Sequence, residues 1–269
     1  MTPFPGRGAL AILKEPPIRL LVRRLVRVLP FGLRRKAWWD AAARPHYLHG
    51  VLYAAEQARR EGRPSVAVIE FGVAEGAGLL AMQAYAAAVE RESGVEVRVY
   101  GFDTGRGLPT GTGDHRDHPD VWKAGDFPMD EAALRPRLAA RTTLVLGDLA
   151  TTAMGQTFAA PIGFAALDLD LYSSTAAALQ VLLREDVARL RRVALYVDDV
   201  EGASYHRFAG ALLAIEEFNR GSAQVKIDRW RGVQGGRPFP DAHWLRRMYV
   251  AHDLGAIGGV TLDRGPATR

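Results

Sequence analysis

The segment "SVAVIEFGVAEGAGLL", Ser65 to Leu80, decides the fold of this chain. It begins as an apolar run with β-branched residues, which predicts a buried strand, and then passes through a glycine-rich turn into a segment of helical composition that ends at Gly94. The next segment, "VEVRVYGFD", alternates in the manner of a second strand. Together these segments predict a βαβ unit.

Strand and helix patterns continue to alternate after this unit. Three further apolar runs, "TTLVLGD", "IGFAALD" and "RVALYVD", are separated by helices or helix-sized gaps, and "VKIDRW" and "RRMYVAHDL" come last. Five strands separated in this way indicate an α/β fold, in which a parallel sheet with right-handed crossovers is covered on both faces. We expect the last two strands to pair antiparallel at the edge.

Composition narrows the classes of protein that fit. The chain has 269 residues, 48% of them hydrophobic, which suits one large domain or a domain with a small appendage. It contains no cysteine, which excludes disulfides, thiolate zinc sites and a cysteine nucleophile. No apolar run approaches membrane-spanning length and the N-terminus lacks the order of a signal peptide, so we expect a cytoplasmic protein without a membrane partner.

The net charge of +5 is concentrated at the N-terminus. Residues 1–44 contain ten Lys or Arg and two acids, whereas the remainder contains 25 basic and 28 acidic residues. The body therefore lacks the basic field that phosphate contacts need, and we expect no nucleic-acid partner. We predict a basic helical extension over 1–44 and a main domain over 45–269.

The basic segment from Ile18 to Lys36 predicts a short amphipathic helix that ends near Val28, before Pro30 and Gly32. One function for such a helix is docking on an anionic membrane or a polyanion. The alternative that we favour is a helix that caps the domain or contacts another subunit, with its arginines in solvent. A homodimer or higher homo-oligomer remains one alternative for the assembly.

Acids follow every one of the five parallel strands. Ligands of such sheets bind outside the carboxyl ends of the strands. A single acid at this place is commonly a helix cap, but acids after all five strands favour a ligand site. They are Glu70, Asp103, Asp148, Asp168, Asp170, Asp198 and Asp199.

The glycine turn narrows the kind of ligand. Glycines let the backbone approach a ligand closely at the start of a helix. Their spacing, G-x-x-x-G-x-G, departs from the dinucleotide fingerprint G-x-G-x-x-G. Glu70 before the turn and Asp103 after the second strand suit a different adenosine ligand, whose ribose hydroxyls donate to a carboxylate and whose other end is not a phosphate.

At this point the sequence resembles a known family. "EFGVAEGAG", "GFDTGRGLP", "DLDLYSST" and "VDD" are similar to the class I S-adenosylmethionine-dependent methyltransferases and, within them, to the macrocin-type sugar O-methyltransferases. The resemblance covers residues 44–254 and implies a Rossmann-like, mostly parallel seven-stranded sheet. Two departures concern the acceptor: Thr104, Gly105 and Arg106 replace the family's usual aromatic and acid, and Val200 replaces a usual Tyr.

The resemblance also implies a cofactor site for S-adenosylmethionine. Glu70 and Gly72 would line its methionine part, with Gly76 in the same glycine turn. Asp103 would hold the ribose, and Asp148 would lie near the adenine.

It further implies a divalent metal, with Mg²⁺ as the first choice. Asp168, Asp198 and Asp199 would hold the ion, and Asp170 would act as the base. Hard carboxylate oxygens do suit Mg²⁺, Mn²⁺ or Ca²⁺. His206, just past the acidic pair, is a second candidate base.

These residues predict an S-adenosylmethionine-dependent O-methyltransferase that methylates a hydroxyl group of a sugar or glycosylated small molecule. A catechol-type O-methyltransferase is the second enzymatic alternative, since its acceptor also offers adjacent hydroxyls. The non-enzymatic alternative is a membrane- or RNA-associated protein that keeps the fold without the activity.

Two further segments hold candidate acceptor contacts. In the long loop from Gly107 to Asp130, Trp122 and Phe127 suit a lid over an acceptor. The loop also holds two histidines and two acids that we expect to be solvated or to contact substrate rather than a metal, namely His115, His118, Asp114 and Asp117. In the helix from Arg44 to Gln57, Tyr47 and His49 face either the acceptor or the core.

Overall fold

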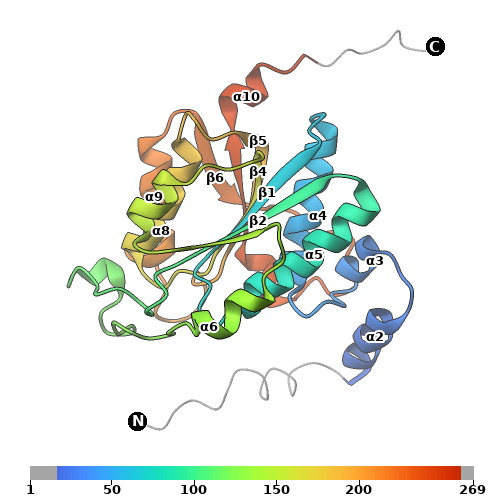
Figure 1. The fold of residues 1–269 in the computed structure, drawn as a ribbon, viewed down its shortest axis with the longest axis horizontal. Coiled ribbons are helices and arrows are strands. Elements are labelled where there is room, and N and C mark those ends of the chain that lie inside the picture. The colour runs from blue at the N-terminus through green and yellow to red at the C-terminus, as the bar shows by residue number, and fades with distance from the viewer. Residues whose placement is uncertain (1–16, 262–269) are drawn as a thin grey trace.

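The computed structural model describes residues 17–261, which form a seven-stranded sheet with helices on both faces (Figure 1). The strand order is β3-β2-β1-β4-β5-β7-β6. The strands are β1 (Ser65–Phe71), β2 (Glu96–Asp103), β3 (Thr142–Leu146), β4 (Ile162–Leu167), β5 (Arg189–Val197), β6 (Val225–Arg229) and β7 (Met248–Asp253).

The predicted fold class is confirmed. Strands β1 to β5 pair in parallel, and β7 runs antiparallel to both β5 and β6. The expected antiparallel pair therefore exists, but β7 is inserted between β5 and β6 and only β6 forms the edge. Because the order reverses between β1 and β4, the carboxyl ends of these two strands form the switch point at which such sheets bind ligands.

Helices cover the two faces separately (Figure 1). The helices α4 and α5 pack on one face, and α7, α8 and α9 pack on the other. The α-helices in the described chain are α2 (Pro17–Val28), α3 (Leu33–Trp38), α4 (Pro45–Arg60), α5 (Ala77–Ser93), α6 (Glu131–Leu134), α7 (Leu149–Gly155), α8 (Tyr172–Gln180), α9 (Gly210–Gly221) and α10 (Leu254–Gly258).

The central strands are apolar on both faces because both faces are buried. Val66 and Val68 of β1 join the core beneath α4 and α5, while Ala67 and Ile69 join the core beneath α8 and α9. This explains why the strand sequences read as continuous apolar runs rather than as alternating ones. Glu70 continues the Val66–Val68 face, so its carboxyl group points toward α4.

The basic helix α2 ends at Val28 as predicted, but the expectation that its arginines lie in solvent is wrong for Arg19 and Arg23. Arg19 pairs with Asp241 at 2.8 Å, and Arg23 Nε donates to the carbonyl oxygen of Asp40 at 2.9 Å. Apolar side chains lie on the exposed face instead: Leu21, Leu25 and Val28. Arginine is favoured on the inner face because the carbonyl oxygen of Asp40 and the carboxylate of Asp241 accept hydrogen bonds from it there.

The domain boundary at residue 44 stays a prediction. None of the helices between residues 17 and 261 is both long enough and apolar enough to cross a membrane.

Close packing of α4 on β4 gives a stability prediction. A Cβ atom on Gly50 of α4 would lie 2.4 Å from the ring of Phe164. We expect Gly50→Val to lower the free energy of unfolding by about 1–3 kcal/mol, because the helix must shift to admit the side chain. Gly155→Val is the control, since no atom lies within 4 Å of a Cβ there. Urea unfolding measures both, and an equal loss in the two variants would contradict the prediction.

Candidate active site at the carboxyl ends of the strands

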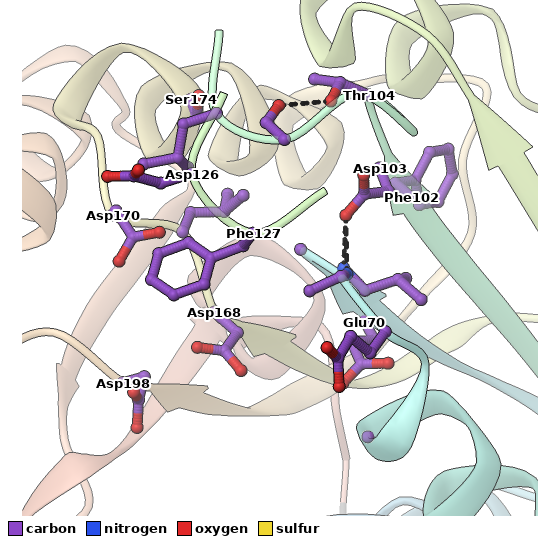
Figure 2. Close-up of a pocket in the computed structure, with 18 of the residues that line it drawn as sticks. Glu70, Phe102, Asp103, Thr104, Asp126, Phe127, Asp168, Asp170, Ser174 and Asp198 are labelled. Carbon is purple, nitrogen blue, oxygen red and sulfur yellow. Dashed lines mark hydrogen bonds between the residues drawn. The ribbon is translucent and has the colours of Figure 1, made fainter. Parts of the chain in front are cut away.

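A cavity of about 840 Å³ opens at the carboxyl ends of β1, β2, β4 and β5. Figure 2 shows Asp168, Asp170 and Asp198 at one end and Glu70 and Asp103 at the other, with the ring of Phe127 between them. The acids that line it are Glu70, Glu75, Asp103, Asp126, Asp168, Asp170, Asp198 and Asp199. The structure therefore brings six of the seven predicted rim acids to one cavity.

The glycine turn follows β1 and lies between the carboxyl ends of β2 and β4. Gly72 has φ +87° and its N–H donates to the carbonyl oxygen of Phe102 at 2.9 Å. A Cβ atom on Gly72 would lie 2.0 Å from the carbonyl oxygen of Asp168. Gly76 also has φ +87°, and a Cβ there would lie 2.3 Å from Leu134. Both positions require glycine for conformation and for space.

Asp103 holds the glycine turn in place. Its Oδ2 accepts from the backbone N–H groups of Val73 and Ala74 at 2.8 and 2.9 Å, and its Oδ1 accepts from the N–H of Gly105 at 2.7 Å. Figure 2 shows Asp103 with one of these bonds to the glycine turn. Because a carboxylate has about four acceptor sites, these bonds leave room for a hydroxyl donor from the cavity. Its role toward a ribose stays a prediction.

Glu70 is buried beneath the cavity. The Tyr47 hydroxyl donates to its Oε1 at 2.5 Å, whereas Oε2 has no hydrogen-bond partner among the described residues. Burial raises the pKa of Glu70 to about 8, against the lowering effect of the Tyr47 hydrogen bond. A cationic ligand group beside this free oxygen would favour the ionised carboxylate, which then accepts from that group.

Asp148, like Gly76 and His206, is a predicted site residue that does not line the main cavity. It caps α7, accepting from the Ala150 N–H at 2.9 Å, and it lines a neighbouring hollow. Leu149, the next residue, lines both the hollow and the cavity. Proximity of Asp148 to an adenine stays a prediction.

The acids at the ends of β4 and β5 lie close together, Asp199 buried and Asp168, Asp170 and Asp198 half-buried. Burial and the charges of Asp198 and Asp199 raise the pKa of Asp168 to about 7. Burial and a hydrogen bond with Asp199 raise the pKa of Asp170 to about 8, and burial also raises that of Asp199. Asp198 is compensated separately, since the Tyr196 hydroxyl donates to it at 2.6 Å and Arg247 pairs with the same oxygen.

The acids after β4 and β5 have the donor atoms of a metal site but not its spacing. The ligand chemistry fits a hard divalent cation, because the acids offer only oxygen and the guanidinium of Arg247 already stands in as a cation beside Asp198. In the described part of the chain, however, no three Asp, Glu or His side chains gather closely enough to hold an ion. The predicted ligands Asp168, Asp198 and Asp199 thus share the cavity without forming a ready-made cluster.

His206 does not reach the cavity, contrary to the role considered for it. The chain turns away after Asp199, and His206 is exposed, with its ring against His118 and Phe208. We therefore do not retain His206 as a base.

The long loop after β2 supplies one wall. Trp122 and Phe127, expected to form a lid, both line the cavity, and their ring centroids lie 6.0 Å apart. Phe127 has φ +60°, which is uncommon for a bulky residue and directs the ring over the opening (Figure 2). Closure over an acceptor stays a prediction.

Of the four polar residues on this loop expected to be solvated or to contact substrate, two are buried beneath it. Asp117 accepts from Ser173 N–H at 2.8 Å and from the Thr112 hydroxyl at 2.9 Å, so it pins the loop to the start of α8. His118 is buried beside it. These two residues are structural, because each lies under the loop rather than on its outer surface.

Sequence reasoning missed part of the wall contributed by the start of α4. Arg44 and His46 line the cavity, and the His46 ring stacks on Tyr196 with centroids 4.1 Å apart. Burial lowers the pKa of His46 to about 3, so its imidazole is neutral. A signal was present, because a helix that precedes a parallel strand begins at the carboxyl edge of the sheet and Pro45 marks that beginning.

The two residues that sequence reasoning considered on α4 do not line the cavity. Tyr47 is fully buried and reaches Glu70, and His49 packs against Trp230 and Trp244 at centroid distances of 5.0 and 5.5 Å. The core alternative therefore holds for both.

Comparisons with known proteins agree with this architecture. No family model matched the sequence, and no curated protein matched it. The chain is similar to the crystal structure of CalS11, calicheamicin methyltransferase, with TM-score 0.52 and 20% identity over 94% of this chain and 99% of that chain. At this identity the likeness shows the fold, which is the Rossmann-like methyltransferase fold.

Two further solved structures match with lower TM-scores. The apo structure of CalS11, described as a TDP-rhamnose 3′-O-methyltransferase, has TM-score 0.45 and 22% identity over 90% of each chain. An O-methyltransferase from Bacillus cereus in complex with SAH has TM-score 0.36 and 12% identity over 90% of this chain and 92% of that chain.

Glu70 gives a prediction for the pH dependence of stability. Its folded pKa of about 8 lies above the ordinary value of 4.5, so the folded state keeps a proton that the unfolded state releases. The contribution of Glu70 is then present below about pH 4.5 and is lost as pH rises through about 8. Glu70→Gln cannot titrate, so its stability relative to wild type should increase from about pH 5 to about pH 8. Urea unfolding without ligand tests this, and a constant difference would contradict it.

Proposed function

We propose that this protein is an S-adenosylmethionine-dependent O-methyltransferase that acts on a hydroxyl group of a sugar or glycosylated small molecule. One observation carries the proposal: the glycine turn after β1, Asp103 of β2 and the acids that follow β4 and β5 line a single cavity. The fold shared with CalS11 supports the same class. A glycine turn with an acid after β2 suits an adenosine ligand, and the acids suit a hydroxylated acceptor.

The residues divide the work between the two ends of the cavity. S-adenosylmethionine, when bound, supplies an electrophilic methyl group on sulfur. Asp103 accepts from the ribose hydroxyls, and Glu70 accepts from the amino group of the methionine part. Trp122 and Phe127 line the space between the two ends, and their closure over a bound acceptor would exclude water from it.

Asp170 takes the proton of the acceptor hydroxyl. Its raised pKa makes its ionised carboxylate a stronger base than an exposed one. As the oxygen–methyl bond forms and the sulfur–methyl bond breaks, the hydroxyl proton passes to Asp170, and the products are a methyl ether and S-adenosylhomocysteine.

The proposal includes a divalent cation, with Mg²⁺ as the first choice, because carboxylate oxygens are the ligands that hard cations prefer. Asp168, Asp198 and Asp199 would hold it, and it would stabilise negative charge on the acceptor oxygen. Asp168, Asp198 and Asp199 repel one another, and a bound cation would offset this repulsion.

Calorimetry with S-adenosylhomocysteine tests the class of enzyme. We expect wild-type protein to bind it, and no binding by the folded protein would overturn the proposal. Methyl transfer from S-adenosylmethionine to a panel of glycosides, sugar nucleotides and catechols then separates the sugar-type acceptor from the catechol-type alternative.

Asp170→Asn tests the base. We expect turnover to fall by about 10²–10⁴-fold, because proton transfer is lost, while affinity for S-adenosylhomocysteine is unchanged. Asp120→Asn is the control, an exposed acid on the long loop that does not line the cavity. Wild-type turnover in Asp170→Asn would exclude Asp170 as the base and leave the enzyme class standing.

Paramagnetic titration with Mn²⁺ tests the metal. With S-adenosylhomocysteine present, we expect wild type to bind Mn²⁺ and Asp199→Asn to bind it at least about tenfold more weakly, since one ligand oxygen becomes an amide. Asp126→Asn, which changes an acid on the loop side of the same cavity, serves as the control. Equal Mn²⁺ binding by all three proteins, or full activity in excess EDTA, would remove the metal from the proposal.

A further inference from the structure

The cavity has an uneven balance of charge. Eight acids line it, and Arg44 is the one arginine or lysine among its lining residues in the described chain. The sulfonium cofactor carries two positive groups, its sulfonium and its ammonium, and one negative group, its carboxylate. The acids of the cavity suit the two positive groups of the cofactor, and Arg44 suits its carboxylate.

Arg44 is held in place and has no carboxylate partner. Its backbone N–H donates to the Tyr85 hydroxyl at 3.3 Å, and its guanidinium carbon lies 5.4 Å from the centroid of the Tyr47 ring. Among the described residues it forms no ion pair. Its positive charge lies near enough to Glu70 to act against the rise in the pKa of that carboxyl group, and both residues line the same cavity.

Arg44 is the group that can donate to an anion at the Glu70 end of the cavity, because the other positive feature there is already occupied. The start of α5 is the other positive feature there, but the carboxyl group of Glu70 already lies against it, because a Cβ on Gly78 would lie 1.7 Å from Glu70 Oε1. Tyr47 joins the two charged residues, since its hydroxyl donates to Glu70 and its ring lies under Arg44.

We propose that Arg44 binds the carboxylate of the methionine part of the cofactor, opposite the free Glu70 oxygen that accepts from the amino group. The inference rests on the proposed function and deepens it by adding a binding residue. It also places the last residue of the predicted N-terminal extension inside the cofactor site.

Paired ligands test this assignment. S-adenosylhomocysteine carries the carboxylate, and its decarboxylated analogue has hydrogen in that place. We expect Arg44→Gln to weaken S-adenosylhomocysteine binding by about 10- to 100-fold, the size of a lost charge-assisted interaction. Binding of the decarboxylated analogue should change by less than about twofold, because no partner of Arg44 is present in it.

Two variants serve as controls. Arg59→Gln removes the same charge from the exposed end of the same helix and should bind both ligands as wild type does. Arg44→Lys keeps the charge and should recover part of the affinity for S-adenosylhomocysteine alone. Thermal melting of each variant without ligand shows whether the fold is kept.

Each outcome decides the matter. Equal losses for both ligands in Arg44→Gln would show that Arg44 only shapes the cavity, and no loss for either would place the carboxylate elsewhere; both results overturn the inference while the methyltransferase assignment stands. Failure of wild type to bind S-adenosylhomocysteine would overturn both.

Discussion

The close approach of β1 to β4 at their carboxyl ends is the constraint on which the rest of the site depends. At Gly72 the two strand ends come so near that one methyl group would collide with the carbonyl oxygen of Asp168. The glycine turn then changes direction with a positive φ and is fixed by the carboxylate of Asp103 from the next strand. Three strands therefore meet at one point, and the cavity opens directly above it.

The same meeting point has an electrostatic cost. Parallel strands place their final residues at one edge, so acids that follow several strands are forced together. Two contacts reduce the repulsion between these carboxyl groups. They are the hydrogen bond between Asp170 and Asp199 and the ion pair of Asp198 with Arg247. What remains is an acidic cavity that favours positively charged ligands, and this preference is compatible with a sulfonium and with a divalent metal ion.

Arg44, the one arginine or lysine that lines the cavity in the described part of the chain, makes the two ends of the cavity differ in charge. A ligand with charge of one sign has no reason to choose one end, whereas a zwitterion that places its carboxylate at Arg44 must turn its amino group toward Glu70. Helix α4 contributes this arginine because it runs antiparallel to the strands and begins at their carboxyl edge. In the proposed binding mode, the helix that covers one face of the sheet thus also orients the ligand.

The sequence by itself determined the alternation of strands and helices, the glycine turn and the acids at the strand ends, because these are local properties of consecutive residues. Which side chains contact one another depends instead on the tertiary structure. Arg247 pairs with Asp198, 49 positions away in sequence, Asp117 is buried beneath its own loop, and Arg19 and Arg23 of α2 point inward. His206 follows the acids closely in sequence yet lies outside the cavity, while Arg44 lies far from them in sequence and lines it. Such contacts depend on where the chain returns in space, which spacing along the sequence does not encode.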